Sequence, residues 1–313
     1  MGRISFGVLP LFLLLTKDMK KIAVIINPRS GSNAKLEEFI KKIRDIFLSF
    51  QVEPKIVLLY RVIDLKQKIA GLLTEGHEII VAAGGDGTIS SVARELVGTK
   101  AILGVIPNGT FNHFAKDVGI PLDIFEAIAV IVNGTPRYID VGSVNDTVFI
   151  NNSSIGIYSQ LVRRRTELEQ RGWGRYIGFI KIVAYLFIRR PFIKARLLSR
   201  GEERFARTPF VFIGNNHYTF SGIGLGSRHA LNQNVLTVCT MPGVKRWQLL
   251  ALIARGFIGW LRPHTDIEAT LVKEVRVVLE KPFVLVSIDG EIATIKTPLY
   301  YKSKPKALAL MLP

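Results

Sequence analysis

Cysteine is nearly absent from this chain of 313 residues, which contains only Cys239. A single cysteine excludes an internal disulfide and any metal cluster built on several cysteines, and it fits a reducing cytosol. Long apolar runs are also missing. The run from Val8 to Leu15 is too short to span a bilayer and no small-residue cleavage site follows it. We therefore expect no transmembrane helix, and we interpret residues 1–18 as an extension ahead of a start near Met19.

Acidic residues are scarce in the second half of the chain. Residues 1–145 carry 17 Lys and Arg against 14 Asp and Glu, a net charge of +3, whereas residues 146–313 carry 25 against 11, a net charge of +14. Such a basic half favours an acidic partner, which would be nucleic acid or an anionic membrane surface. Hydrophobic residues make up 48% and charged residues 21%, which is typical of a folded chain long enough for two domains.

Apolar strands alternate with amphipathic helices in the first third of the chain. Strands are expected at 22–26, 55–60, 78–83 and 101–106, and helices at 34–50, 62–73 and 89–97, the last with Thr88 or Ser90 near its N-cap. This order predicts a parallel, doubly wound α/β sheet. Polar turns at Asn27, Gly84 and Pro107 follow three of these strands. Because ligands of such sheets bind beyond the carboxyl ends of the strands, these turns predict a nucleotide site.

The turn Gly84–Thr88, with the sequence GGDGT, carries the most chemical information. Glycines let the backbone approach an anion, and the first N–H groups of the following helix favour phosphate. Asp86 would repel phosphates, so we expect its carboxylate to hold a metal ion or a positioned donor. The alternative is a glycine-rich turn without a ligand.

After residue 140 the pattern changes to short β-type runs, which predict a mainly antiparallel second domain, as a sandwich or an open barrel. The expected strands are 147–151, 193–198, 210–214, 235–240, 275–279 and 283–288. Two basic, aromatic-rich helical stretches at 175–190 and 246–262 fit helices that lie at a lipid interface or that cover the β core.

Four motifs follow one another along the chain: Asn27-Pro28-x-Ser30-Gly31, Gly84-Gly85-Asp86-Gly87-Thr88, Pro107-x-Gly109-Thr110-x-Asn112 and Asp289-Gly290-Glu291. Together they resemble the diacylglycerol kinase-like lipid kinases, which include sphingosine and ceramide kinases. The resemblance runs from about Lys20 to the C-terminus. It implies an ATP-binding domain at 19–142, a β-sandwich lipid domain at 143–297, and a return of residues 298–313 to the first domain.

The resemblance also implies an activity: ATP- and Mg²⁺-dependent phosphorylation of a lipid hydroxyl, such as that of diacylglycerol, in phospholipid biosynthesis. The expected location is the cytoplasm, at the inner face of the membrane, with no nucleic-acid partner; a homodimer stays open. Asp289 matches the family's proton acceptor, with Glu291 beside it, and Asp86 would contact the Mg²⁺ of ATP. The implied ATP-site residues are Asn27, Pro28, Ser30, Gly31, Gly84, Gly85, Asp86, Gly87, Thr88, Gly109, Thr110 and Asn112.

The sequence departs from the family at three places. Ser91 stands where many relatives have Glu, and His113 where many have Asp. The stretch Leu231–Val235, which includes Gln233, has no carboxylate where bacterial diacylglycerol kinases bind a structural Mg²⁺. Because Mg²⁺ prefers charged oxygen ligands, we expect that metal site to be absent.

Other functions remain open from the residues alone. An NAD kinase-like enzyme is one alternative, because NAD kinases share the GGDG turn. A lipid-binding protein with weakened catalysis is another, motivated by Ser91 and the missing metal turn. Nucleic-acid binding would fit the charge of +14, but no helix-turn-helix, RNA-recognition or zinc pattern supports it. Asp289 itself could also be part of a plain Asp-Gly hairpin turn.

Overall fold

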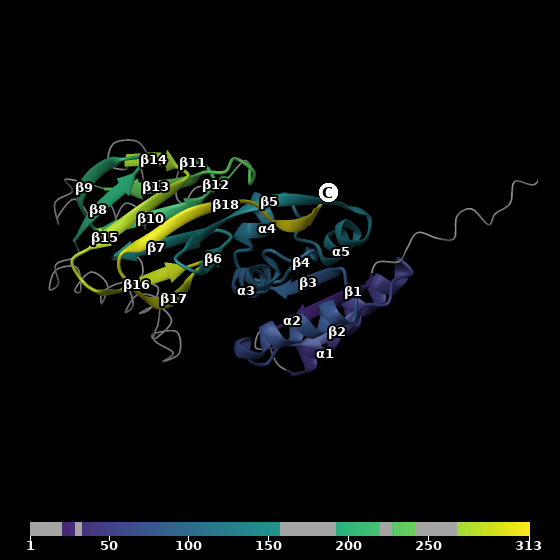
Figure 1. Ribbon diagram of the computed structural model, residues 1–313. Coiled ribbons are helices and arrows are strands. Elements are labelled where there is room, and N and C mark those ends of the chain that lie inside the picture. Colours follow the sequence, from purple (N-terminus) through teal and green to yellow (C-terminus); the bar gives the residue numbers. More distant parts are fainter. Residues whose placement is uncertain (1–20, 29–32, 157–191, 220–226, 229, 242–267) are drawn as a thin grey trace, which may run out of the picture.

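The computed structural model describes residues 21–28, 33–156, 192–219, 227–228, 230–241 and 268–313. In the part of the chain that the structure describes, a helix-covered sheet forms one part of the molecule and β strands form the other (Figure 1). The N-terminal extension, the turn residues Ser30 and Gly31, and the two helical stretches at 175–190 and 246–262 lie outside the described residues. Within the described residues, no helix is long and apolar enough to cross a membrane.

The first part is a parallel sheet with helices on both faces, as predicted. Its strands are β1 (Ile22–Ile26), β2 (Lys55–Leu58), β3 (Ile79–Gly84) and β4 (Ile102–Pro107), in the order β2-β1-β3-β4. Helices α1 (Asn33–Ser49) and α5 (Ile124–Asn133) pack on one face, and α2 (Leu65–Thr74) and α3 (Asp86–Leu96) on the other. The strands are continuous apolar runs because both of their faces are buried.

The helix after the glycine turn begins earlier than expected. We expected it at Ile89 with Thr88 or Ser90 near the cap, and both expectations are wrong. Helix α3 starts at Asp86, and Gly85, in an extended conformation, is the N-cap. The physical reason is the short turn, since Gly85 alone connects β3 to α3. The expected helix at 62–73 is divided into a 3₁₀ turn, η2 (Val62–Asp64), and α2, and a short helix, α4 (His113–Asp117), was not expected.

The second part is a sandwich of two antiparallel sheets. One has the order β14-β13-β10-β7-β16-β17. Its strands are β7 (Asn152–Gly156), β10 (Phe210–Asn215), β13 (Leu236–Thr240), β14 (Glu268–Val272), β16 (Phe283–Ile288) and β17 (Glu291–Lys296). The facing sheet contains β5 (Thr135–Val144), β6 (Thr147–Phe149), β8 (Ile193–Ser199), β9 (Glu202–Thr208), β15 (Glu274–Leu279) and β18 (Leu299–Leu312). Strands β11 (Tyr218–Thr219) and β12 (Ser227–Arg228) form a separate short pair. The core between the sheets includes Phe149 and Tyr301 from one side and Ile155 and Val286 from the other.

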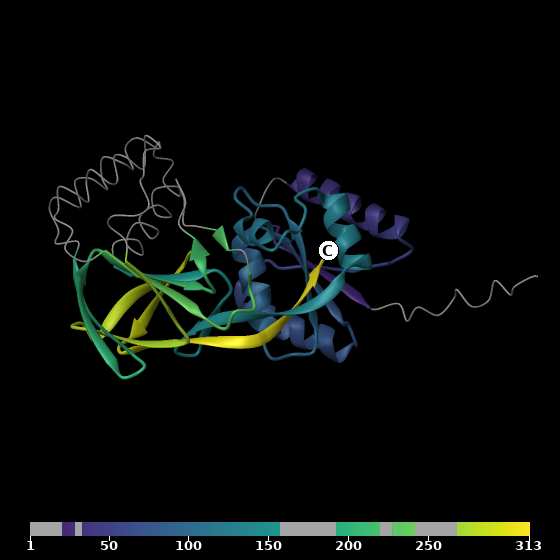
Figure 2. The same cartoon turned by 90° about the horizontal axis from the view of Figure 1, so that it is seen from above.

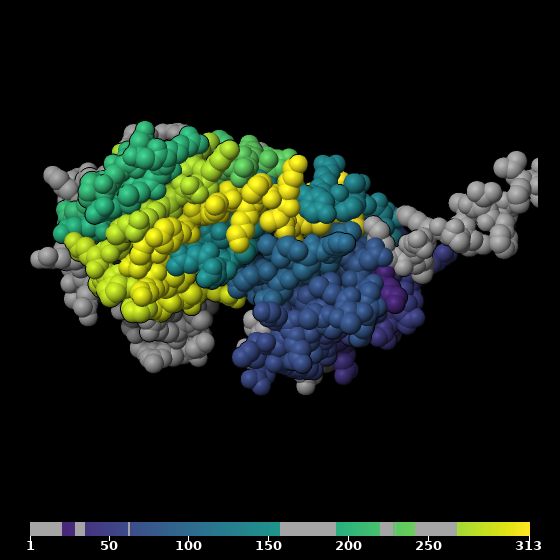
Figure 3. All heavy atoms as spheres, in the orientation of Figure 1, coloured from purple at the N-terminus to yellow at the C-terminus, as the bar shows by residue number. Residues whose placement is uncertain are grey.

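Strand β18 joins the two parts into one continuous sheet of ten strands. Its first residues pair with β15, and Tyr301 to Leu312 pair with β5 with a register shift between Lys304 and Leu308. Ala309 and Leu310 also pair in parallel with Ile102 and Leu103 of β4. The view from above shows β18 running from the sandwich into the helical part, where the chain ends (Figure 2). In the space-filling view this strand bridges the two parts on the visible face, and a notch separates them below it (Figure 3).

Candidate active site

Two glycine-bearing turns meet at the carboxyl edge of the parallel sheet. The N–H of Asn108 donates to the carbonyl of Gly84 over 2.9 Å, so the turn after β4 is bonded to the turn after β3. A Cβ at Gly109 would lie 2.6 Å from the Cα of Gly85, a distance that only glycine permits. Asn27 and Pro28 follow β1, the neighbour of β3, and so end at the same edge.

Asp86 has a defined structural role. Its carboxylate accepts hydrogen bonds from the backbone N–H groups of His113 (3.2 Å) and Phe114 (3.1 Å), which are the first residues of α4. These N–H groups have no partner inside their own helix, so Asp86 satisfies them. From the sequence, the partner of the Asp86 carboxylate could be a metal ion or a positioned hydrogen-bond donor. The partners observed are donors, namely the two N–H groups of α4. Among the described residues no group of three or more His, Cys, Asp or Glu could hold a metal.

Asn112, in the third motif, stabilises its own turn. Asn112, in the left-handed region (φ 51), accepts from the N–H of Gly109 (2.8 Å) and donates to the carbonyl of the same residue (3.0 Å). Thr110 is exposed, as is His113, whose ring stacks on Phe111 with 5.5 Å between ring centroids. Both polar groups of the Asn112 side chain are therefore engaged within the turn.

Ser91 is buried on α3 and donates to the carbonyl of Gly87, one helical turn earlier, over 2.8 Å. The hydroxyl at this variant position thus has a partner inside its own helix.

Asp289 occupies a tight hairpin between β16 and β17. Ile288 pairs with Glu291, and Asp289 (φ 49) and Gly290 (φ 87) form the two-residue loop typical of an Asp-Gly hairpin. The carboxylate points back to the segment between β6 and β7, where it accepts from the N–H groups of Ile150 (2.9 Å), Asn151 (2.8 Å) and Asn152 (3.1 Å). Burial raises the pKa of the Asp289 carboxyl, against the lowering effect of these hydrogen bonds and of the Arg94 guanidinium.

Glu291 contacts the first part of the molecule through Arg94. The Arg94 guanidinium on α3 donates to the Glu291 carboxylate over 3.3 Å and to the carbonyl of Val148 over 3.1 Å. Arg94 thus connects the helix of the glycine turn with the hairpin that carries Asp289. Sequence reasoning missed Arg94, because an arginine in an amphipathic helix carries no signal of its partner.

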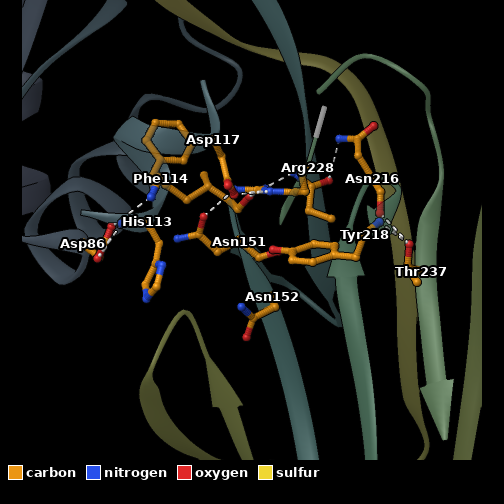
Figure 4. A network of polar contacts seen from close by, with 12 residues as sticks. Asp86, His113, Phe114, Asp117, Asn151, Asn152, Asn216, Tyr218, Arg228 and Thr237 are labelled. Atoms are coloured by element: carbon orange, nitrogen blue, oxygen red, sulfur yellow. Dashed lines mark hydrogen bonds and ion pairs between the residues drawn. The ribbon is translucent and has the colours of Figure 1, made fainter. Parts of the chain in front are cut away.

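A polar network also joins the two halves, and sequence reasoning missed most of its members. Asp117, at the end of α4, pairs with Arg228, which in turn contacts Asn151 (Figure 4). Tyr218 lies against Arg228. Burial raises the pKa of Tyr218 to about 12, so its hydroxyl stays neutral and donates to the carbonyl of Asn151. The glycine turns and the Asp289 hairpin are therefore parts of one connected arrangement.

The turn at Leu231–Val235 is held by protein groups. The buried carboxylate of Asp140, on β5, accepts from the N–H of Asn234 (2.6 Å) and from the N–H of Lys306 on β18 (2.8 Å). The N–H of Gln233 donates to the side chain of Asn216 over 3.0 Å. Hydrogen bonds to Asp140 and Asn216 thus hold this turn. It corresponds to the turn where bacterial diacylglycerol kinases bind a structural Mg²⁺, and we expected no such metal site here.

Comparison with known proteins confirms the resemblance stated above. Residues 21–144 match the family described as the diacylglycerol kinase catalytic domain. A "Diacylglycerol kinase" of Mycobacterium tuberculosis (strain CDC 1551 / Oshkosh) is 27% identical over 256 residues, which cover 80% of this chain and 82% of that protein. A "Probable lipid kinase YegS-like" of Pseudomonas putida is 32% identical over 150 residues, which cover 47% of this chain and 49% of that protein.

Solved structures share the fold. A diacylglycerol kinase from Bacillus anthracis superposes with a TM-score of 0.69 at 19% identity, covering 95% of this chain and 98% of that one. Yeast NADH kinase, complexed with NADH, reaches a TM-score of 0.53 at 13% identity, covering 95% of this chain and 84% of that one. The α/β plus β-sandwich architecture is thus confirmed.

Proposed function

Because residues 21–144 relate this chain to the diacylglycerol kinase family, we propose that it is an ATP-dependent lipid kinase. It transfers the γ-phosphoryl group of ATP to a lipid hydroxyl, such as that of diacylglycerol, at an anionic membrane surface. The observation that carries the proposal is that one set of polar contacts joins the glycine turns to the Asp-Gly-Glu hairpin. A phosphate site and a candidate proton acceptor therefore belong to one arrangement.

The glycine turns fit the phosphates of ATP. The N–H groups of Thr88 and Ile89 donate to the carbonyl of Gly85, so those of Asp86 and Gly87 precede the first bonds of α3 and, with the helix dipole, would favour an anion. The contact between Gly85 and Gly109 leaves no side chain over this part of the backbone. Gly84 to Thr88 and Gly109 to Thr110 would then contact the phosphates, with Asn27 and Pro28 beside them. Asn112 would act by shaping its turn, since its side-chain amide is bonded to Gly109.

Magnesium would reach this site bound to the phosphates of ATP, where it neutralises charge during transfer. A resident metal held only by protein carboxylates does not fit the described residues, which contain no cluster of three or more metal-binding side chains. Asp86 is the carboxylate we propose to face that ion, through lone pairs not used by the N–H groups of α4.

Asp289 would orient the lipid hydroxyl and accept its proton late in the reaction. Phosphoryl transfer has a loose transition state, so positioning matters more than a strong base. Hydrogen bonds from Ile150, Asn151 and Asn152 fix the carboxylate, and its raised pKa strengthens it as a proton acceptor. Glu291 would keep the hairpin in place through its contact with Arg94.

Membrane docking would depend mostly on two basic segments. Among the 25 Lys and Arg of residues 146–313, 12 lie in segments 157–191 and 242–267, which contain only three Asp and Glu. By contrast, several basic residues of the sandwich have acidic partners. These ion pairs are Lys194–Glu280, Arg196–Glu203 and Lys302–Glu274. The net positive charge available to anionic lipid therefore concentrates in the two segments.

One assay tests the proposal. Purified protein is incubated with labelled ATP, Mg²⁺ and vesicles carrying diacylglycerol, phosphatidylglycerol, a long-chain base or a prenyl alcohol, with soluble NAD as a separate acceptor. Label in a lipid product is the expected result. Label in NADP would instead identify an NAD kinase, the function favoured by the fold likeness to yeast NADH kinase. Vesicle binding without any labelled product would indicate a lipid-binding protein without catalysis.

A further inference from the structure

Arg228 is a buried cation, and each of its three guanidinium nitrogens donates a hydrogen bond. Its side chain has no solvent exposure. The guanidinium donates to the Asp117 carboxylate (2.8 Å), to the carbonyl of Ile150 (2.6 Å) and to the side-chain oxygen of Asn151 (2.7 Å), and it lies 5.2 Å from the centre of the Tyr218 ring. A planar guanidinium presents donors in several fixed directions at once, which an ammonium cannot do.

Two of these partners also hold Asp289. The N–H groups of Ile150 and Asn151 donate to the two carboxylate oxygens of Asp289, while the carbonyl of Ile150 and the side chain of Asn151 receive Arg228. The side chain of Asn215 donates to the same Ile150 carbonyl over 3.0 Å. The segment that sets the position of the Asp289 carboxylate is thus bound on its other side by Arg228.

The remaining partner of Arg228 leads to the glycine turn. Asp117 is the last residue of α4, a single short helix whose first N–H groups are bound by Asp86. Figure 4 shows His113 and Phe114 of α4 next to Asp86, and the side chains of Asp117 and Asn151 beside the guanidinium of Arg228. Arg228 is therefore linked to both elements of the proposed active site. Ile150 and Asn151 link it to Asp289, and Asp117 on α4 links it to Asp86.

We propose that Arg228 is a positioning residue that holds Asp289 at a fixed place relative to the glycine turns. The proposal deepens the proposed lipid-kinase function and rests on it. Arg228 touches neither substrate nor the reacting atoms in this scheme; it acts through Ile150 and Asn151 on Asp289, and through Asp117 on the helix that Asp86 binds. Loss of its directed contacts should misplace the acceptor while leaving nucleotide binding intact.

The kinetic test is a double-mutant cycle between Arg228→Lys and Asp289→Asn, because lysine keeps the charge but not the directed contacts. A misplacement of the order of 1 Å can cost about 10²-fold in rate, so we expect Arg228→Lys to lower kcat by roughly 10-fold or more, with KM for ATP within about twofold. In the Asp289→Asn background the same change should lower kcat by less than about twofold, because the residue through which Arg228 acts is already impaired. Equal losses in both backgrounds would overturn the proposal.

A second measurement does not depend on any kinase activity. We expect the backbone N–H groups of Ile150, Asn151 and Asn152 to exchange with solvent faster in Arg228→Lys than in the unchanged protein. Unchanged exchange there would overturn the proposal, whereas faster exchange in a protein that phosphorylates no lipid would contradict only the proposed function. Arg204→Lys is the matched control, because Arg204 forms an exposed ion pair with Glu268 and should alter neither readout. If Arg228→Lys fails to fold, Asp117→Asn, which weakens the same pair, takes its place in both experiments.

Discussion

The two roles of Asp86 can be separated by substitution. In Asp86→Ala the N–H groups of His113 and Phe114 lose their acceptor at the start of α4. Removing an acceptor from the start of a helix costs about 1–2 kcal/mol. For a domain of this size each kcal/mol corresponds to about 2–4 °C in Tm, so we expect melting roughly 2–8 °C lower. The same variant should also lose lipid phosphorylation and bind Mg-ATP more weakly, since the carboxylate that we propose to face the metal is removed.

Asp86→Asn distinguishes the two effects. Asparagine retains one oxygen and has no charge for a metal ion, so it can accept from only one of the two N–H groups, which bond to different oxygens of Asp86. We therefore expect it to recover part of the lost stability without recovering Mg-ATP affinity, measured by thermal melting and by calorimetric titration. The matched control is Asp123→Ala, since Asp123 accepts from the N–H groups of Phe125 (2.8 Å) and Glu126 (3.1 Å) at the start of α5. It should lose similar stability and leave Mg-ATP binding unchanged.

Two results would refute this reasoning. A melting temperature of Asp86→Ala equal to that of the unchanged protein would show that the contacts with α4 contribute nothing to stability. Unchanged Mg-ATP affinity together with unchanged turnover would reduce the turn Gly84–Thr88 to a structural element.

Four further predictions address other parts of the molecule. Asp289→Asn should lower turnover by about 10²-fold or more with little change in ATP affinity, and near-full activity would contradict its assignment. An ordinary Asp carboxyl has a pKa of about 3.9, and burial raises the pKa of Asp289 above its ordinary value. Its carboxylate is therefore protonated at a higher pH, so kcat/KM should begin to fall on the acid side at a pH above that of an ordinary Asp. A fall of kcat/KM only at or below the ordinary value would contradict this. Gly109→Ala would put a Cβ 2.6 Å from the Cα of Gly85 and should cost about 1–3 kcal/mol in urea unfolding, whereas Gly87→Ala, with open space around it, should cost much less. Chelation by EDTA should leave Tm unchanged, since Asp140 holds the turn at Asn234 without a metal, and a large drop would reveal a structural ion.

Membrane docking was predicted from charge and is open to a direct test. Each Lys or Arg near an anionic surface contributes about 1 kcal/mol, and the attraction is screened over about 8 Å at physiological salt. Co-sedimentation with phosphatidylglycerol vesicles should therefore fall steeply as salt rises, and neutral vesicles should capture much less protein. Equal capture by both kinds of vesicle would contradict the electrostatic account, and RNA that outcompetes the vesicles would favour the nucleic-acid alternative.

The sequence alone predicted the parallel sheet well, because strands buried on both faces are continuous apolar runs such as IAVII and IIVAAG. It failed for strands whose patterns are polar. Strand β7 reads NSSIG yet is largely buried, since neighbouring strands on both sides satisfy its backbone. No strand was predicted for β18, which contains Lys302, Lys304 and Lys306 and pairs with partners far away in the chain. The resemblance did imply that residues 298–313 return to the first domain, where β18 pairs with β4.

The sequence also revealed the resemblance to the diacylglycerol kinase-like lipid kinases, because four motifs in a fixed order carry it even though the contacts between them are unknown. Only the tertiary structure decided what the motif residues touch: Asp86 binds the N–H groups of α4, and Asp289 binds those of residues 150–152. Among the Lys and Arg of the described residues, it also singled out Arg228, by a contact with Asp117 across 111 positions of the chain. No local pattern distinguishes a buried arginine from an exposed one, because burial and pairing are set by which elements pack together, and that is a property of the whole fold.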